Sequence, residues 1–234
     1  MGSLQDLVTN KYGFDLTEQQ EDMVIRDLEL IIEANATINL TRIVSWDSAM
    51  CRHIEDSLAG VPYVLAAPDG LYGDLGTGGG FPGIPMAIVT GRKTLLVDSV
   101  QKKMRVLDGV IHELGLSNQV STYAGRIEDL AKQRRGEFAV LTARALSSLP
   151  SLLELASPLL KLHGRLVCYK ANPSDAEMES MRKIVRKLGF SLPEMHQFDL
   201  EDGSHRTIMV FQKVSKASIS LPRRIGLAQN EPLA

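Results

Sequence analysis

The chain has 234 residues, of which 44% are hydrophobic and 23% charged, and its formal net charge is −2. This composition is that of an ordinary globular protein, long enough for one large domain with an appendage. No apolar run nears the length that a bilayer requires and no signal peptide is visible, so we expect a cytoplasmic protein with no membrane partner. The two cysteines, Cys51 and Cys168, form no C-x-x-C pair, which argues against a metal site and a disulfide framework.

The first 60 residues predict a helical region. Thr17 and Gln20 have the spacing of a capping box, and apolar residues recur at helical intervals between Met23 and Ile32. We therefore expect residues 1–60 to form an N-terminal helical extension of the larger domain that follows.

A strand predicted over Leu71–Leu75 runs directly into a glycine-rich segment that ends at Pro85. Glycine has no Cβ, so the backbone can turn sharply here and approach a ligand closely. Pro82 supplies a preset φ for the first turn of the next helix, whose unpaired N–H groups would face that ligand. Strand, loop and helix in this order predict a site for an anionic or nucleotide-like molecule, with a simple surface turn as the alternative.

Two kinds of cofactor use such a loop, and the glycine spacing fits both. Gly78, Gly80 and Gly83 satisfy the dinucleotide pattern G-x-G-x-x-G, which would indicate an NAD(P)-dependent oxidoreductase. Read from Asp74 through Gly76, Gly78 and Gly80, the segment is D-x-G-x-G-x-G, which resembles motif I of the S-adenosylmethionine-dependent methyltransferases. We favour the second interpretation, because it gives Asp74 a role in accepting hydrogen bonds from the cofactor's ammonium group or an ordered water.

A second acid closes the next predicted strand, over residues 93–98. Asp98 falls 20 residues after Gly78, where a carboxylate is placed to accept hydrogen bonds from two ribose hydroxyls. Ser99 is available to cap the helix predicted over Val100–Leu114. The two residues would then divide ligand binding and helix capping between them.

Strand and helix signals continue to alternate along the rest of the chain. Strands are predicted over 120–123, 138–141, 165–169, 194–198 and 207–212, and helices over 149–160 and 176–188, with Gly189 as a C-terminal cap. This alternation predicts an α/β fold with a mostly parallel sheet covered by helices on both faces. We expect residues 61–214 to form this domain and residues 215–234 a basic C-terminal tail, all within one integrated unit.

Ligands of such sheets bind beyond the carboxyl ends of the strands. Ile127, Glu128 and Asp129 follow the third predicted strand and are placed to meet an adenine edge. Arg144 follows the fourth and is expected to meet a cofactor carboxylate or a substrate phosphate. Pairing of Arg144 with a neighbouring carboxylate at the surface is the alternative.

Several segments together resemble the bacterial small-subunit ribosomal RNA methyltransferase G family. The resemblance spans roughly residues 35 to 233, and its most specific element is the Phe-Pro-Gly-Ile-Pro continuation of the glycine loop. The matching segments are Asn39–Thr41, Arg52–Leu58, Phe81–Pro85, Leu96–Ser99, Lys102-Lys103, Ala143–Ala145, Lys170, Pro222–Gly226 and Pro232-Leu233. The family implies a class I S-adenosylmethionine-dependent methyltransferase fold, Rossmann-like with a seven-stranded mostly parallel sheet. It also implies methyl transfer to N7 of a guanine in a 16S rRNA loop.

The resemblance also implies which residues bind the cofactor. The family's contacts fall on Gly76, Phe81, Ile127, Glu128 and Arg144 of this chain, beside Asp74, Gly78 and Asp98 from the loop and strand pattern. The chain departs from the family at Ala139, where an acid is usual, and at Ala143, where a serine is usual. The second change removes a hydroxyl that could have touched substrate or cofactor near Arg144.

The chemistry implied for N7 of guanine needs positioning more than acid–base help. The nitrogen carries a lone pair and no proton, so we assign no catalytic residue, with Arg144 as the one possibility. The target base has to leave its loop to reach the cofactor. His53 and Asp56, three residues apart on a helix, would contact RNA or close the cofactor pocket, or else form a buried structural hydrogen bond.

Basic residues give the expected contacts to RNA despite the negative net charge. Five of them and no acid lie between Arg206 and Arg224, which favours a local basic surface over a solvated tail. The expected RNA-binding residues are Arg52, His53, Lys170, Arg206, Arg223 and Arg224. We expect 16S rRNA or the small ribosomal subunit as partner and a monomeric protein. A non-catalytic RNA-binding ribosome-assembly factor with the same fold remains an alternative.

Overall fold

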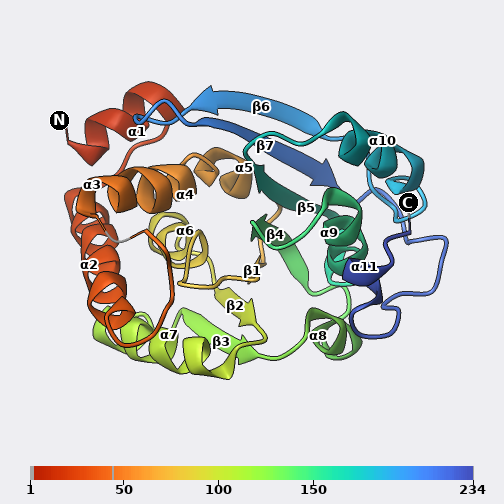
Figure 1. Ribbon diagram of the computed structural model, residues 1–234, viewed down its shortest axis with the longest axis horizontal. Helices are drawn as coiled ribbons and strands as arrows, with labels where there is room; N and C mark the ends of the chain where they lie inside the picture. Colours follow the sequence, from red (N-terminus) through yellow and green to blue (C-terminus); the bar gives the residue numbers. More distant parts are fainter. Residues whose placement is uncertain (1–2, 44, 234) are drawn as a thin grey trace.

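The computed structural model describes residues 3–43 and 45–233 and forms one seven-stranded sheet (Figure 1). The strand order is β3-β2-β1-β4-β5-β7-β6, in which β1 to β5 are parallel and β7 is antiparallel to both its neighbours. The strands are β1 Leu71–Leu75, β2 Thr94–Asp98, β3 Val120–Ala124, β4 Phe138–Arg144, β5 Leu160–Lys170, β6 Glu194–Asp199 and β7 His205–Gln212. The predicted α/β fold with a seven-stranded, mostly parallel sheet is confirmed.

The central strands extend further than their apolar runs predicted. β4 continues three residues past Leu141 to Arg144, and β5 begins at Leu160. Both extensions are paired, since Ala143 and Arg144 lie opposite Cys168 and Tyr169, and Leu160 lies opposite Phe138. Thr142 interrupts the apolar pattern, but it is fully buried and its hydroxyl is hydrogen-bonded, so its polarity does not end the strand.

Helices cover both faces of the sheet. In Figure 1, α6 and α7 lie on one side and α8, α9 and α10 on the other. They are α6 Gly83–Thr90, α7 Gln101–Glu113, α8 Ile127–Gln133, α9 Leu149–Ala156, α10 Asp175–Ile184 and the short α11 Leu227–Asn230. The predictions of α9 to residue 160 and α10 to residue 188 were too long, because each helix gives way to turns before the next strand. No described helix is both long and apolar enough to span a bilayer.

Capping at the start of α7 differs from the prediction. The Ser99 side chain makes no cap hydrogen bond; instead the Val100 N–H donates to Asp98 Oδ1 at 2.9 Å. The assignment of this cap to Ser99 was therefore wrong. The Asp98 carboxylate accepts the hydrogen bond because its side chain reaches the N–H two residues further along the chain, as in an Asx turn.

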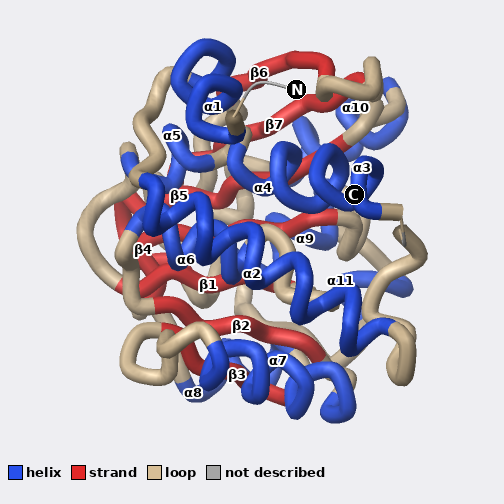
Figure 2. The backbone as a smooth tube through the Cα atoms, turned by 90° about the vertical axis from the view of Figure 1, so that its left-hand side faces the viewer, coloured by secondary structure: helices blue, strands red, loops and turns tan. Residues whose placement is uncertain are grey.

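The N-terminal region is helical, as predicted, and packs on the sheet domain. It contains α1 Leu4–Tyr12, α2 Glu18–Asn35, α3 Trp46–Ala49, the π-helical segment η1 Met50–Glu55, α4 Asp56–Leu58 and α5 Val61–Leu65. The capping box of α2 is confirmed, since Thr17 and Gln20 exchange both hydrogen bonds. Figure 2, in which the left-hand side of Figure 1 faces the viewer, shows α2 running across the front of the molecule. Its buried residues Leu28 and Ile31 share one apolar cluster with α6 and α7, so the extension and the domain have a common core.

The two faces of β4 pack against different apolar clusters, which shows where a serine in place of Ala143 would lie. Val140 belongs to the apolar cluster under α2 and α6, whereas Leu141 and Ala143 belong to the cluster under α8 and α9. Ala143 is fully buried there, and so is Ala139 on the same strand. A serine hydroxyl at position 143 would lie in this apolar layer, so its loss leaves the surroundings of Arg144 intact.

The last residues of the chain are packed against the domain, which corrects part of the predicted basic surface. Leu221 and Ala228 are buried in the cluster of α8 and α9. Lys213 is only 5% exposed and donates to Ser157 and to the Leu188 carbonyl. It is therefore buried and is not part of a basic surface. Its burial lowers the pKa of its ammonium group to about 8.

Arg223 also has a structural partner. Its guanidinium donates from Nε and Nη2 to the two oxygens of Glu154, at 2.6 and 2.7 Å. The Glu154 side chain is 2% exposed and lies on α9. This bidentate ion pair fastens the C-terminal segment to the helix layer.

Replacement of Arg223 by alanine should therefore destabilise the fold. Arg223→Ala leaves the buried Glu154 carboxylate without its charge partner, and we expect the free energy of unfolding to fall by about 3 kcal/mol. Denaturant titration followed by circular dichroism measures this change. The exposed neighbour provides the control, since Arg224→Ala should stay within about 0.5 kcal/mol of the parent. Equal losses in both variants would contradict the role of the ion pair.

Candidate functional site

The glycine loop joins β1 to α6 at the carboxyl edge of the sheet. Gly76, Gly78 and Gly80 have φ values of 70°, 58° and 91°, in the left-handed region that side chains with a Cβ rarely adopt. Gly83 is needed for another reason, since a Cβ there would lie 2.3 Å from Leu96. The loop conformation thus depends on the glycines that the sequence pattern singled out.

The buried side chain of Asp74 holds the end of this loop through hydrogen bonds. Its side chain is 1% exposed; Oδ2 accepts from the Gly83 N–H at 3.1 Å and Oδ1 from the Thr142 hydroxyl at 2.6 Å. Burial raises the pKa of its carboxyl to about 6, against the opposing effect of these hydrogen bonds. The structure places Asp74 under the loop, where it links β1, β4 and α6, and its carboxylate does not line the cavity above.

Asp98 lines a small cavity of about 100 Å³ on one side of Gly76. Its Oδ2 accepts from the Gly78 N–H at 3.1 Å, and its Oδ1 from Val100, so each oxygen keeps a lone pair for a further donor. Ile127 and Leu146 supply apolar walls. The cavity therefore combines an apolar slot with a carboxylate that could accept hydrogen bonds from vicinal hydroxyls.

Glu128 borders the same cavity but is engaged by the C-terminal segment. It is 3% exposed, and its Oε1 accepts from the Gly226 N–H at 2.7 Å. Gln229 of α11 also reaches this cavity. Neither Leu146 nor Gln229 was found from the sequence, because Leu146 belongs to no motif and Gln229 is brought here by the packing of the chain end.

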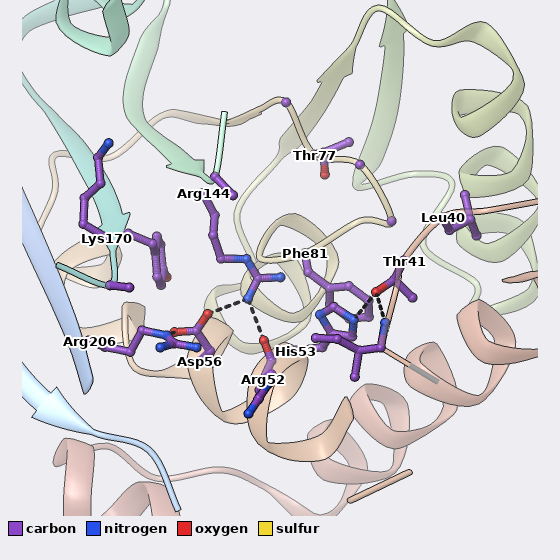
Figure 3. A pocket seen from close by; sticks show the side chains of 17 residues that line it. Leu40, Thr41, Arg52, His53, Asp56, Thr77, Phe81, Arg144, Lys170 and Arg206 are labelled. Carbon is purple, nitrogen blue, oxygen red and sulfur yellow. Dashed lines mark hydrogen bonds and ion pairs between the residues drawn. The ribbon is translucent and has the colours of Figure 1, made fainter. Parts of the chain in front are cut away.

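A larger cavity of about 590 Å³ lies on the other side of Gly76 (Figure 3). Its walls come from the loop before α3, from η1 and α4, from the glycine loop and from the ends of β4, β5 and β7. It brings together most of the predicted cofactor and RNA residues: Gly76, Gly78, Phe81, Arg144, Arg52, His53, Lys170 and Arg206. Arg223 and Arg224 are not among its lining residues.

Phe81 and His53 form one wall of this cavity. Their rings are stacked with centroids 4.6 Å apart and planes 5° from parallel. His53 Nε2 is 2.7 Å from the Thr41 hydroxyl, so the predicted structural hydrogen bond of His53 is confirmed. Burial and the nearby Arg144 lower the pKa of His53 to about 4, which keeps the imidazole neutral at pH 7.

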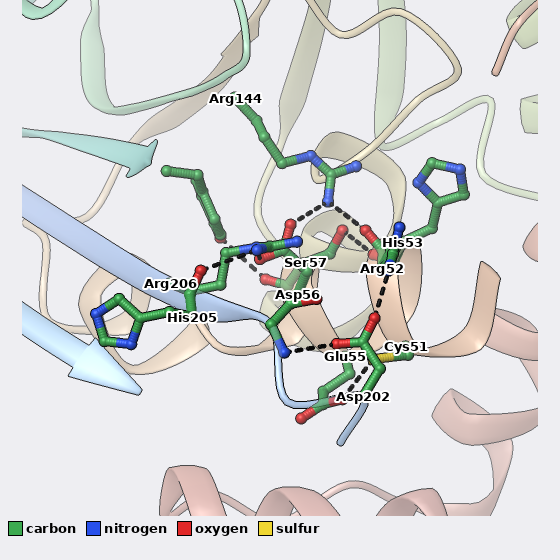
Figure 4. Close-up of polar contacts among 12 residues, drawn as sticks. Cys51, Arg52, His53, Glu55, Asp56, Ser57, Arg144, Asp202, His205 and Arg206 are labelled. Atoms are coloured by element: carbon green, nitrogen blue, oxygen red, sulfur yellow. Dashed lines mark hydrogen bonds and ion pairs between the residues drawn. The ribbon is translucent and has the colours of Figure 1, made fainter. Parts of the chain in front are cut away.

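Next to this wall lies a carboxylate shared by two arginines (Figure 4), with the Arg144 guanidinium 6.0 Å from the centre of the Phe81 ring. Arg144 Nη1 donates to Asp56 Oδ2 at 2.9 Å, and Arg206 Nε donates to Asp56 Oδ1 at 3.1 Å. Asp56 is 4% exposed, and Arg144 also donates to the Arg52 carbonyl at 3.2 Å. Arg144 does pair with a neighbouring carboxylate, but the pair lies inside the cavity rather than at the surface that the alternative expected, and the pairing leaves the proposed ligand contact of Arg144 open.

The other basic residues of the cavity have acids of their own. Lys170 Nζ donates to Glu177 at 2.7 Å and to the Ser147 carbonyl. The Arg52 guanidinium lies 2.7 Å from Asp202, and its side chain is 48% exposed. Among the described residues, no three His, Cys, Asp or Glu side chains are grouped so as to hold a metal ion.

Gly76 borders both cavities. The small one offers apolar walls and Asp98, and the large one offers the guanidinium of Arg144. A volume of about 590 Å³ lies within the range of small-molecule sites.

Comparison with known proteins gives a consistent result. Residues 20–208 match the family model described as rRNA small subunit methyltransferase G. "Ribosomal RNA small subunit methyltransferase G" of Streptococcus pyogenes serotype M12 is 33% identical over 225 residues, covering 94% of each chain. The protein of the same name from Streptococcus equi subsp. equi is 34% identical over 232 residues, covering 97% of each.

A solved structure with a similar fold is an O-methyltransferase from Bacillus cereus in complex with SAH. Its TM-score is 0.59 with 17% sequence identity, over 90% of this chain and 97% of that one. At this identity the likeness concerns the fold alone.

The buried Asp74 predicts a pH dependence of stability. Because its pKa is about 6 in the folded protein and near 3.8 when exposed, its contribution to stability is fully present below pH 4 and is lost as the pH rises through 6. We expect the free energy of unfolding of the parent to fall between pH 4 and 7 relative to that of Asp74→Asn, which cannot titrate. Urea titrations at several pH values measure the difference, and a constant difference would contradict the raised pKa.

Proposed function

The chain belongs to the rRNA small subunit methyltransferase G family and is an S-adenosylmethionine-dependent methyltransferase, and we propose that it methylates N7 of a guanine in 16S rRNA. The observation that carries this proposal is that Gly76 borders both cavities, so that a cofactor held by Asp98 would lie beside a base entering the larger cavity. The family and the fold support the methyltransferase interpretation of the glycine loop over the dinucleotide one.

The residues around Gly76 fit this cofactor. Asp98 has acceptor positions for the two ribose hydroxyls, and Ile127 and Leu146 offer an apolar slot for the adenine. Toward the larger cavity, Arg144 keeps N–H groups that suit the carboxylate of the amino-acid end. The bound cofactor supplies an electrophilic methyl group on a sulfonium.

The residues of the chain would act by holding the two reactants in line. The lone pair of N7 attacks without loss of a proton, so no general base is required from the protein. The neutral His53 and the ring of Phe81 bring no charge to this wall of the cavity, and their stacking keeps it rigid. Asp74, beneath the loop, fixes the start of α6 and hence the position of Gly76 to Gly80.

RNA would enter at the rim of the larger cavity. Arg52, His53, Lys170 and Arg206 line this cavity and are the proposed contacts to the strand that carries the target base. Arg224 is exposed but outside it, and Arg223 serves the ion pair with Glu154.

The decisive experiment is methyl transfer to small ribosomal subunits. We expect the protein to move labelled methyl groups from S-adenosylmethionine into 16S rRNA of subunits that lack the modification. Reduction with borohydride followed by aniline cleaves RNA at N7-methylguanosine, so one new cleavage site should appear. Cofactor binding without any label in RNA would contradict the enzyme and favour the non-catalytic assembly factor; calorimetric binding of NAD alone would favour the oxidoreductase.

The proposed cofactor site is tested by removing the carboxylate of Asp98. Asp98→Ala should raise the Kd for S-adenosylmethionine about 30-fold, equivalent to about 2 kcal/mol of lost charged hydrogen bonding. Isothermal titration calorimetry measures the affinity. The control is Asp108→Ala on the exposed side of α7, where the Kd should not change. An unchanged Kd in Asp98→Ala would remove the ribose contact from the proposal.

A further inference from the structure

Among the described residues of the larger cavity, Arg144 and Arg206 carry more positive charge than their acidic partner balances. Arg52 is compensated by Asp202, and Lys170 by Glu177. Arg144 and Arg206, in contrast, share the single carboxylate of Asp56. Two guanidiniums against one carboxylate leave one positive charge, on side chains that are only 15% and 19% exposed. A partly buried excess charge of this kind is costly unless a ligand brings an anion.

The two arginines also have hydrogen-bond donors to spare. A guanidinium carries five N–H groups. Arg144 uses two, to Asp56 and to the Arg52 carbonyl, and Arg206 uses two, to Asp56 and to the His205 carbonyl. Within the described part of the chain, both side chains therefore keep the N–H groups of Nη2 for a ligand, and both line the same cavity.

The position of Arg206 is fixed by more than Asp56. The turn between β6 and β7 is fastened to η1, because the Glu201 N–H donates to Glu55 at 3.0 Å and Arg52 pairs with Asp202 (Figure 4). Arg206 follows this turn as the second residue of β7. Helix, turn and arginine thus form one connected unit on the side of the cavity away from the glycine loop.

We propose that Arg206 binds a backbone phosphate of the rRNA next to the target base, and that Asp56 is the positioning residue for both arginines. This inference rests on the proposed function, because it assumes that RNA enters the cavity. The carboxylate of the cofactor would take the free donors of Arg144. Because the cofactor also carries an ammonium and a sulfonium, its binding would leave the cavity positively charged, and Arg206 would remain for a second anion. A nucleotide turned out of its loop carries a phosphate on either side of its sugar, and a guanidinium fork matches phosphate geometry.

The test separates RNA binding from cofactor binding. Arg206→Gln should raise the KM for small subunits at least about 10-fold, as expected for one lost charged contact, and leave the Kd for S-adenosylmethionine unchanged. The plot of log affinity for subunits against log salt should become shallower by about 0.7 to 0.9, the value of one phosphate. Arg206→Lys should recover most of the salt slope but only part of the KM, because lysine keeps the charge without the fork.

Controls keep this test independent of folding and of the proposed function. Arg182→Gln, on the exposed side of α10, should match the parent in KM and salt slope. The salt slope is measured by binding, so it can be read even if the parent transfers no methyl group, an outcome that would contradict the function but not the phosphate contact. A salt slope unchanged in Arg206→Gln, in protein with the parent's unfolding transition, would overturn the role of Arg206.

The role of Asp56 has a separate signature. Asp56→Asn removes the negative charge that both guanidiniums share and places an NH2 group against their N–H donors, so both arginines lose the contact that orients them. We expect both the KM for subunits and the Kd for the cofactor to rise, whereas Arg206→Gln changes the first alone. A value for either ligand that does not rise would overturn the positioning role of Asp56.

Discussion

The buried carboxylate of Asp74 is the contact on which the rest of the site depends. It joins the end of β1 to Thr142 on β4 and to the first N–H of α6. These three elements carry the glycine loop between them, so its left-handed glycines are held at both ends. The cost of burying the carboxyl is visible in its raised pKa, and its two hydrogen bonds offset part of that cost. A rigid loop of this kind presents its backbone to a ligand without a loss of conformational entropy on binding.

The N-terminal region and the sheet domain together line the larger cavity. The loop before α3 brings Thr41 to His53, and η1 places His53 on Phe81. At the start of α4, Asp56 lies between two arginines. The helical extension is therefore one wall of the site as well as part of the common core. Its attachment to the β6–β7 turn connects this wall to the far edge of the sheet.

Ion pairing decides which basic residues remain available to a ligand. Composition suggested a basic surface between Arg206 and Arg224, but Lys213 lies in the interior and Arg223 binds Glu154. Arg206 comes from the same stretch of sequence and lies in a different place, beside Asp56. The fold thus divides one run of basic residues among the core, an ion pair and the cavity. A negative net charge is compatible with RNA binding because the excess positive charge is concentrated where a phosphate could reach it.

The sequence by itself determined the strands, their alternation with helices and the glycine loop with its two acids, because these depend on local periodicity and on backbone conformations that few residues allow. It also determined the family, through motifs that are contiguous in the chain. Only the tertiary structure decided that Asp74 faces inward, that Glu128 is bound by Gly226, and that Leu146 and Gln229 border the cavity of Asp98. Those outcomes depend on contacts between residues far apart in the chain. A hydrogen-bond partner or an ion pair across such a distance leaves no periodic signal, so the direction and the charge balance of a side chain become defined only when the elements pack together.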